Sequence, residues 1–185
     1  MDLLEDGSWR AVSRGGMPLE NAAVALCNGA AEAEAAVAEL RQQGLGADCI
    51  SVVAVDEQSG VKPIAYYFDG GRLRGTAASG GMRSLLESLP GCVVLVSPGE
   101  PTVLLAGPFA ACVIRTLDNE ELFGDLGPIA AGLYSLGIPR DSARDYELTA
   151  LQGSPLVIVH GRARDVERAR GIVAAWIEGK GQPTR

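Results

Sequence analysis

A histidine and a cysteine at matching positions are the residues of this sequence that could do chemistry together. His160, the single histidine, ends the apolar run 156–160, and Cys27 ends the apolar run 23–27 in the same way. A thiol beside an imidazole can become an activated nucleophile, so the two would suggest an enzyme if their strands were neighbours. Such a site also needs an orienting group and oxyanion donors, for which the sequence offers no candidate. We therefore favour a histidine that ends a strand and bonds to backbone, and we predict no catalytic residue.

The turns that follow these two residues are a second candidate site, one that could bind an anion. Asn28-Gly29 and Gly161 each open a helix, and the amide groups of a helix start can hold an anion. Neither a dinucleotide-binding glycine pattern nor a phosphate-loop lysine accompanies them, so ordinary helix capping is favoured and no cofactor-binding residue is predicted. Glu32 and Glu34, two residues apart, point to different parts of the helix surface and do not form a catalytic pair.

The acids and thiols of the sequence do not form a recognisable metal site. An acidic run fits no calcium loop and indicates a helix start, where negative charge favours the helix dipole: Asp118, Glu120, Glu121 and Asp125. One histidine cannot complete a usual zinc set, and the cysteines form no Cys-x-x-Cys pair. The cysteines lie in or beside apolar runs, which predicts buried, reduced thiols: Cys27, Cys49, Cys92 and Cys112.

The charge of the chain argues against nucleic acid as a partner. Lys and Arg number 16 against 23 Asp and Glu, which gives a net charge of −7, whereas binding to phosphate backbones shows as a basic stripe. One local cluster alternates arginines with acids, which is typical of a solvated, salt-bridged helix face: Arg162, Arg164, Arg168 and Arg170 with Asp165 and Glu167.

The sequence predicts neither a signal peptide nor a membrane span. Residues 1–20 carry acids where a signal peptide needs bases, so we expect a flexible leader there. The longest apolar stretch, 103–114, is interrupted by Pro108 and is shorter than the roughly 20 residues of a span. We expect a cytoplasmic chain with a single domain at 21–178 and a polar tail at 179–185.

A repeated strand–helix unit is the strongest structural signal. Residues 24–40 align with residues 157–173, with Cys27 on His160 and an acid in each first turn. The repeat predicts that both strands belong to one sheet and that both helices lie on one side of it. A strand at 50–55 is expected to return through a right-handed crossover and to run parallel to the first strand.

The central insertion, 60–136, is expected to contain a hairpin and helices. Turn residues and apolar runs predict an edge strand at 63–68, a helix at 76–89, a hairpin of 92–96 with 102–106, a helix from Pro108, and a segment capped by Asp118 or Asn119 through Leu136. A helix from Asp141 or Ser142 to Gln152 then leads to the last unit. Two stripes of small residues indicate close helix packing rather than a membrane role: Gly127, Ala131 and Ser135, and Gly124, Pro128 and Gly132.

These elements predict an α+β protein, a ferredoxin-like two-layer sandwich with a sheet of four to five strands. Helices of the two repeated units cover one face of the sheet. The central helices fill the other face or an oligomer interface, because a sheet with one uncovered face tends to bury it by dimerising.

Several short motifs resemble the bacterial general stress protein family, the heat-induced stress protein YflT-like domain. The similarity covers about residues 22–177 and rests on the sequences AEAEAAVAELRQQG, ISVVAVD, VLLAGPFA, LGIPRDSARDYE and PLVIVHG. It implies a bacterial cytoplasmic protein tied to stress, without established catalytic residues. Members resembling this chain carry long Gly/Ala helices in the middle, whereas charges interrupt that region here: Arg83, Glu87, Arg115, Asp118, Glu120, Glu121 and Asp125.

The function predicted from the sequence is a non-enzymatic, stress-associated binding or interaction module that forms homo-oligomers or binds a protein partner. The alternatives are a sensor of a small anion or nucleotide at the two strand-to-helix turns, an enzyme acting through Cys27 or His160, and a peripheral membrane protein using residues 103–136. No cofactor or integral membrane segment is expected.

Overall fold

The protein is an α+β domain built on one antiparallel sheet. The computed structural model describes residues 22–55, 85–86, 88–95, 101–117 and 124–180. The strands are β1 (Ala22–Leu26), β2 (Ile50–Val55), β3 (Cys92–Leu95), β4 (Val103–Ala106) and β5 (Leu156–His160), in the spatial order β1-β5-β2-β4-β3. Each neighbouring pair is antiparallel. The strands of the two repeated units, β1 and β5, are therefore neighbours in one sheet, as predicted.

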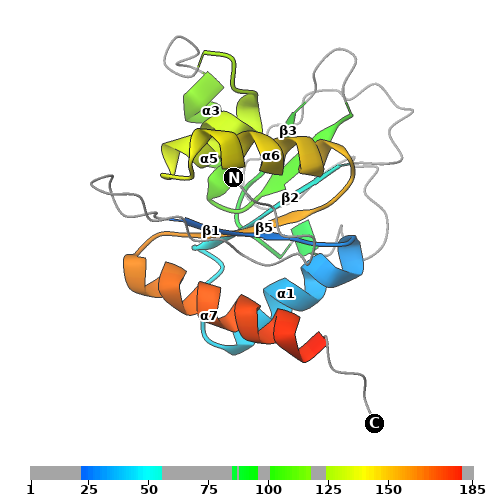
Figure 1. Cartoon of the computed structure of the whole chain (residues 1–185), viewed down its shortest axis with the longest axis vertical. Helices are drawn as coiled ribbons and strands as arrows, with labels where there is room; N and C mark the ends of the chain where they lie inside the picture. Colours follow the sequence, from blue (N-terminus) through cyan, green and yellow to red (C-terminus); the bar gives the residue numbers. More distant parts are fainter. Residues whose placement is uncertain (1–21, 56–84, 87, 96–100, 118–123, 181–185) are drawn as a thin grey trace.

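Helices cover both faces of this sheet. The described helices are α1 (Ala30–Gln42), α3 (Phe109–Leu117), α5 (Pro128–Ser135), α6 (Arg140–Leu151) and α7 (Ala163–Lys180). Figure 1 shows α1 and α7 on one side of the strands and α3, α5 and α6 on the other. The prediction that the two repeated helices share a side is confirmed, and the central helices do fill the other face. The two-layer sandwich is wrong, because the molecule has three layers.

The physical reason for three layers lies in the strands themselves. In β5, Leu156 and Ile158 contact the apolar cluster on the α3 side, and Val157 and Val159 contact the cluster on the α1 side. All four are at most 1% exposed. A strand that is apolar on both faces needs a covering layer on each, which is unlike the half-solvated strand of an open sheet.

The antiparallel register of β1 and β5 places the strand-to-helix turns of the two repeated units at opposite ends of the strand pair. Ala22 lies opposite His160, and Leu26 lies opposite Leu156. Because α1 follows Leu26 and α7 follows His160, the two helices begin at opposite ends of the strand pair. β1 and β2 are both antiparallel to β5, so they run parallel to each other, as predicted, with β5 between them.

The central insertion agrees with the prediction in its hairpin and in the helix after Pro108. The segment predicted from Asp118 or Asn119 to Leu136 is wrong in its described part, because residues 124–127 are turn and coil and Pro128, after the N-cap Gly127, starts the helix. The hairpin is β3 with β4, and α3 follows Pro108. The last central helix begins at Pro128, and α6 begins at Arg140 with Pro139 as its N-cap, slightly before the predicted caps. The predicted strand at 63–68, most of the helix at 76–89, the leader at 1–20 and most of the tail lie outside the described residues.

Candidate functional site

The structure does not bring Cys27 and His160 together. The backbone N–H of Cys27 donates to the carbonyl of Pro155 at 2.9 Å, at the end of the strand pair away from His160. Five residues at about 3.3 Å each place the two ends on the order of 15 Å apart. The strands are neighbours, but they run in opposite directions, so the thiol–imidazole pair that the sequence left open does not form.

His160 instead ends β5 beside the start of β2. Its backbone N–H donates to the carbonyl of Cys49 at 3.0 Å, a main-chain bond that any residue could make here and that does not involve the imidazole. The alternation along β5 places its ring on the side of α3, α5 and α6. The ring nitrogen Nε2 is buried and has no hydrogen-bond partner among the described residues. Burial, and then the Arg115 guanidinium of α3, lower the pKa of His160 below its ordinary value.

Cys49 and Cys92 are not activated nucleophiles. Burial, followed by the charges of Asp48 and Asp165, raises the pKa of Cys49, whose Sγ donates to the Gly46 carbonyl at 3.1 Å. Burial raises the pKa of Cys92 to about 11. Both groups are therefore protonated at neutral pH and are poor nucleophiles. The described cysteines are reduced, as predicted; Cys49 is half-buried and the others are buried: Cys27, Cys92 and Cys112.

Cys112 and Arg115 accompany His160 on the α3 side, which the sequence did not reveal. The Nη2 of Arg115 donates to the Sγ of Cys112 at 3.4 Å, and its Nε donates to the Ala111 carbonyl at 3.3 Å. Arg115 and His160 are 45 positions apart in the chain. Their proximity depends on α3 packing over the strands, for which local sequence carries no signal.

The two helix starts cannot form one anion site. They lie at opposite ends of the sheet, and each first turn carries its own carboxylate, Glu32 in α1 and Asp165 in α7. Glu32 Oε2 accepts a hydrogen bond from the backbone N–H of Asn28 at 2.7 Å. The N-cap of α1 is Gly29, without a side-chain hydrogen bond, so Asn28 is not the cap. A carboxylate near the helix start disfavours a second anion there.

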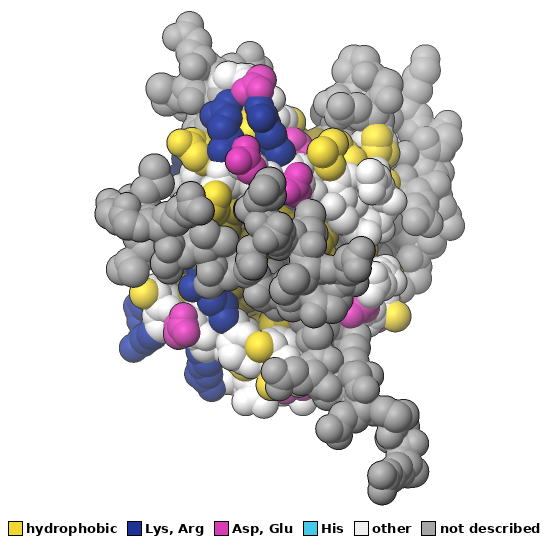
Figure 2. Space-filling model, in the orientation of Figure 1, with side chains coloured by type: hydrophobic (Ala, Val, Ile, Leu, Met, Phe, Trp, Pro, Cys, Tyr) yellow, Lys and Arg dark blue, Asp and Glu magenta, His cyan; other side chains and the backbone are white. Residues whose placement is uncertain are grey.

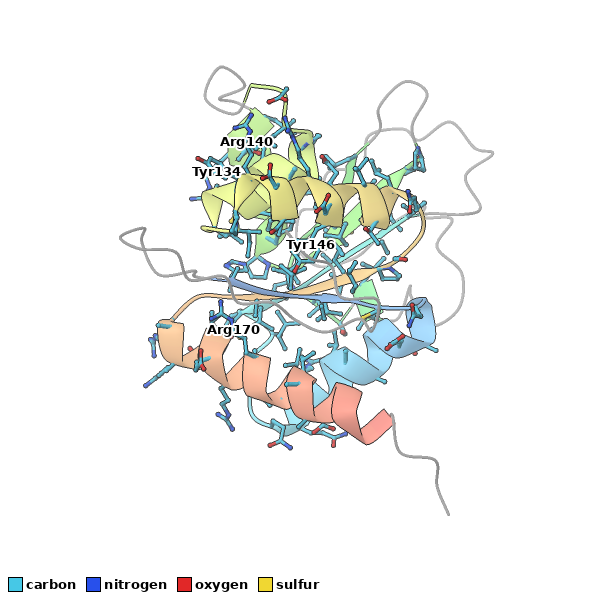
Figure 3. All side chains as sticks on the ribbon, in the orientation of Figure 1. Tyr134, Arg140, Tyr146 and Arg170 are labelled. Atoms are coloured by element: carbon cyan, nitrogen blue, oxygen red, sulfur yellow. The ribbon has the colours of Figure 1, made fainter. Side chains whose placement is uncertain are left out.

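The arginine cluster of α7 is partly a salt-bridged surface and partly a tether. Arg164 pairs with Asp165, and Arg170 with Glu167, each at 3.6 Å. The Nη2 of Arg170 also donates to the Ala22 carbonyl at 3.1 Å, and Figure 3 shows this side chain between α7 and the strands. Arg168 donates to the carbonyl of Gln43 at the end of α1. These bonds join α7 to β1 and α1, a role that the sequence did not predict.

A second polar cluster joins α5 to α6. Asp125 pairs with Arg140 and Arg144, and the Arg140 guanidinium lies 5.9 Å from the Tyr134 ring centroid. Figure 2 shows the mixed basic and acidic side chains gathered over these helices, and Figure 3 shows Tyr134 beside Arg140. Two guanidinium groups share one carboxylate here, so the cluster is a surface ion-pair network rather than an empty anion site.

Glu147 of α6 supplies the missing cap of α5. Its Oε1 accepts from the backbone N–H of Ile129 at 2.8 Å, in the first turn of a helix that has no side-chain cap of its own. A Cβ on Gly127 would lie 2.4 Å from Glu147 Oε2, so the carboxylate approaches only because that residue is glycine. One of the predicted small-residue stripes thus serves the contact between α5 and α6.

Replacing Glu147 by alanine is expected to lower the free energy of unfolding by about 1–2 kcal/mol, because the cap is lost and a part-buried N–H loses its acceptor. Urea denaturation monitored by far-ultraviolet circular dichroism measures the change. Glu34→Ala, on the half-buried surface of α1, is the matched control and is expected to shift stability by less than about 0.5 kcal/mol. Equal losses in the two variants would contradict the cap.

The described part of the chain offers no cluster of three or more His, Cys, Asp or Glu side chains placed to hold a metal ion. Within the same residues, every helix is too short or too polar to cross a membrane. Comparisons with protein-family models, with curated proteins and with solved structures give no match for this chain. The fold and the site therefore define its class as an α+β protein with helices on both faces of an antiparallel sheet.

Proposed function

We propose that this chain is a non-enzymatic interaction module that associates with itself through the outer surface of α3, α5 and α6. One observation carries the proposal: large apolar side chains remain exposed on this helical layer, namely Ile114 (38%), Leu117 (41%), Tyr134 (38%) and Leu148 (58%). The side chains described in α1 and in residues 163–175 of α7 contribute none of this group. Apolar side chains left on one face are typical of protein contact surfaces.

The proposed interface lies on the outer surfaces of helices and not on the sheet. An uncovered sheet face would itself favour dimerisation, but both faces here are buried under helices. Association must then use helix surfaces. Leu148, the most exposed of the four, projects from α6 near the ion-pair network of Asp125, Arg140 and Arg144. An exposed apolar side chain with charged groups beside it is compatible with a protein interface, in which a polar rim surrounds apolar contacts.

The finer parts of the proposal have separate support. A ferredoxin-like relation is supported by the split unit β1-α1-β2, in which β5 lies between two parallel strands. The association with stress, and a place in a bacterial cytoplasm, are supported by the short motifs alone. The alternative function, a sensor of a small anion or nucleotide, has less support, because the two turns that would form its binding site lie at opposite ends of the sheet.

Replacing Leu148 by glutamate is expected to weaken self-association at least about tenfold, because a charge would be buried at the contact. Size-exclusion chromatography with light scattering, over a dilution series down from tens of micromolar, measures the dissociation constant. Ala35→Glu adds the same charge to an exposed position of α1 on the other layer and should leave association unchanged. A wild-type chain that is monomeric throughout would contradict the proposal.

A further inference from the structure

The ring of half-buried His160 has one nitrogen, Nε2, that its surroundings do not satisfy. Its Nε2 is buried without a hydrogen-bond partner among the described residues, at the point where β5 ends beside the start of β2. A neutral imidazole tolerates this position, since only one weak polar atom goes unpaired. A protonated imidazolium requires an acceptor for each of its two N–H groups, and leaving a charged donor unpaired is far more costly.

The charge facing His160 from the neighbouring helix is also positive. Among the described groups, the Arg115 guanidinium of α3 is the charge that acts on the ring. Across the strands, His160 faces Ala22 of β1 and the Cys49 backbone, neither of which carries a charge. Asp165 acts on the Cys49 thiol, which packs on the α1 side of the sheet. A second cation at His160 would therefore meet repulsion from α3.

We propose that His160 makes the contact between α3 and the sheet sensitive to acid, so that protonation of its ring opens this contact. One polar contact between α3 and the same face of the sheet is a backbone hydrogen bond: the N–H of Phe109, the first residue of α3, donates to the buried Oγ of Ser51 at 3.0 Å. Apolar side chains of α3 also pack on this face, with Phe109 and Val113 fully buried. Opening would expose these side chains to water.

The sign of the effect follows from the direction of the pKa shift. In the open form His160 titrates near its ordinary pKa of about 6.5, and in the closed form the pKa is lower. Above about pH 6.5 both forms are neutral and the closed form keeps its full stability. As pH falls from there to the closed-form pKa, only the open form gains a proton, so the equilibrium moves toward opening. Each unit of pKa difference corresponds to about a tenfold change in the opening equilibrium.

Hydrogen exchange of the full chain tests the proposal. Mass spectrometry at pH 7.5 and 5.5, corrected for the intrinsic pH dependence of exchange, should show several-fold faster opening of residues 109–117 at the lower pH, while residues 163–175 of the opposite layer change little. His160→Gln keeps a polar side chain without a titrating group and should remove the difference. An equal acceleration in both layers, or the same acceleration in the variant, would overturn the proposal.

The wild-type chain provides a second test that does not depend on the variant folding. Because the sequence has one histidine, its imidazole proton resonance titrates alone in a nuclear magnetic resonance spectrum. The midpoint should lie below about 6.5 and should rise in Arg115→Gln. A wild-type midpoint at or above the ordinary value would overturn the proposal. Neither readout requires self-association, so the two proposals can fail independently.

Discussion

Replacing Gly107 by alanine is expected to lower the free energy of unfolding by about 3 kcal/mol or more, the largest effect of the substitutions considered for this chain. Gly107 has a φ of +94°, which a residue with a Cβ adopts only under strain. A Cβ there would also lie 2.3 Å from the carbonyl oxygen of Ile50 and 2.7 Å from the Cα of Ser51. These are backbone atoms of β2, a strand paired on both sides, so they cannot move aside.

The cost should be large because this turn joins three segments. The backbone N–H of Gly107 donates to the Gly91 carbonyl at 3.0 Å, just before β3. Two residues later, the N–H of Phe109 donates to the Ser51 hydroxyl. Strain at Gly107 therefore acts on the start of α3 as well as on the end of β4. Urea denaturation followed by circular dichroism measures the loss.

Gly91→Ala is the matched control for Gly107→Ala. Gly91 also has a positive φ, +69°, but a Cβ there would meet nothing within 4 Å. Its replacement introduces the conformational strain, which costs about 1–2 kcal/mol, and avoids the collision. A loss of the same size in both variants would show that backbone conformation, and not close approach to β2, makes Gly107 necessary.

The elements that could be predicted from sequence are those with local signals. The apolar run 50–55, the hairpin at 92–106 and the helix after Pro108 depend on periodicity and on turn residues within a few positions. The repeat of 24–40 at 157–173 correctly placed β1 beside β5 and both of their helices on one face. A repeat carries no information on direction, however, since parallel and antiparallel neighbours bury the same residues.

The third layer did have a signal in the sequence. The segment 156–159 is apolar at four consecutive positions, which indicates a strand covered on both faces, whereas an open sheet predicts alternation with polar residues. The contacts that position α3 and α5 had no such signal in the sequence. Phe109 bonds to a hydroxyl 58 residues away, and the cap of α5 comes from Glu147, 18 residues from its partner. Such pairs are set by the packed fold and not by neighbours in the chain.

Replacing a glycine by alanine is expected to have opposite effects on stability in α5 and in α7, because only the glycine of α5 lies at a close helix contact. In α5, a Cβ on Gly132 would lie 2.8 Å from Val113 Cγ2 and 2.9 Å from Phe109 Cζ, and both of these side chains are fully buried. Gly132→Ala is therefore expected to lower the free energy of unfolding by about 1–2 kcal/mol, since overpacking exceeds the gain in helix propensity. In α7, a Cβ on Gly171 would meet nothing within 4 Å. Gly171→Ala should stabilise the protein by about 0.5–1 kcal/mol.

Thermal and urea denaturation of the two alanine variants would separate packing from propensity, because the chemical change is the same in two α-helices. The loss at Gly132 should grow with Gly132→Val, whose branched side chain would push further into Phe109, the first residue of α3. If Gly132→Ala stabilised the chain as Gly171→Ala should, α3 and α5 could separate without cost, and the small residue at this crossing would need an explanation other than the approach of two helices.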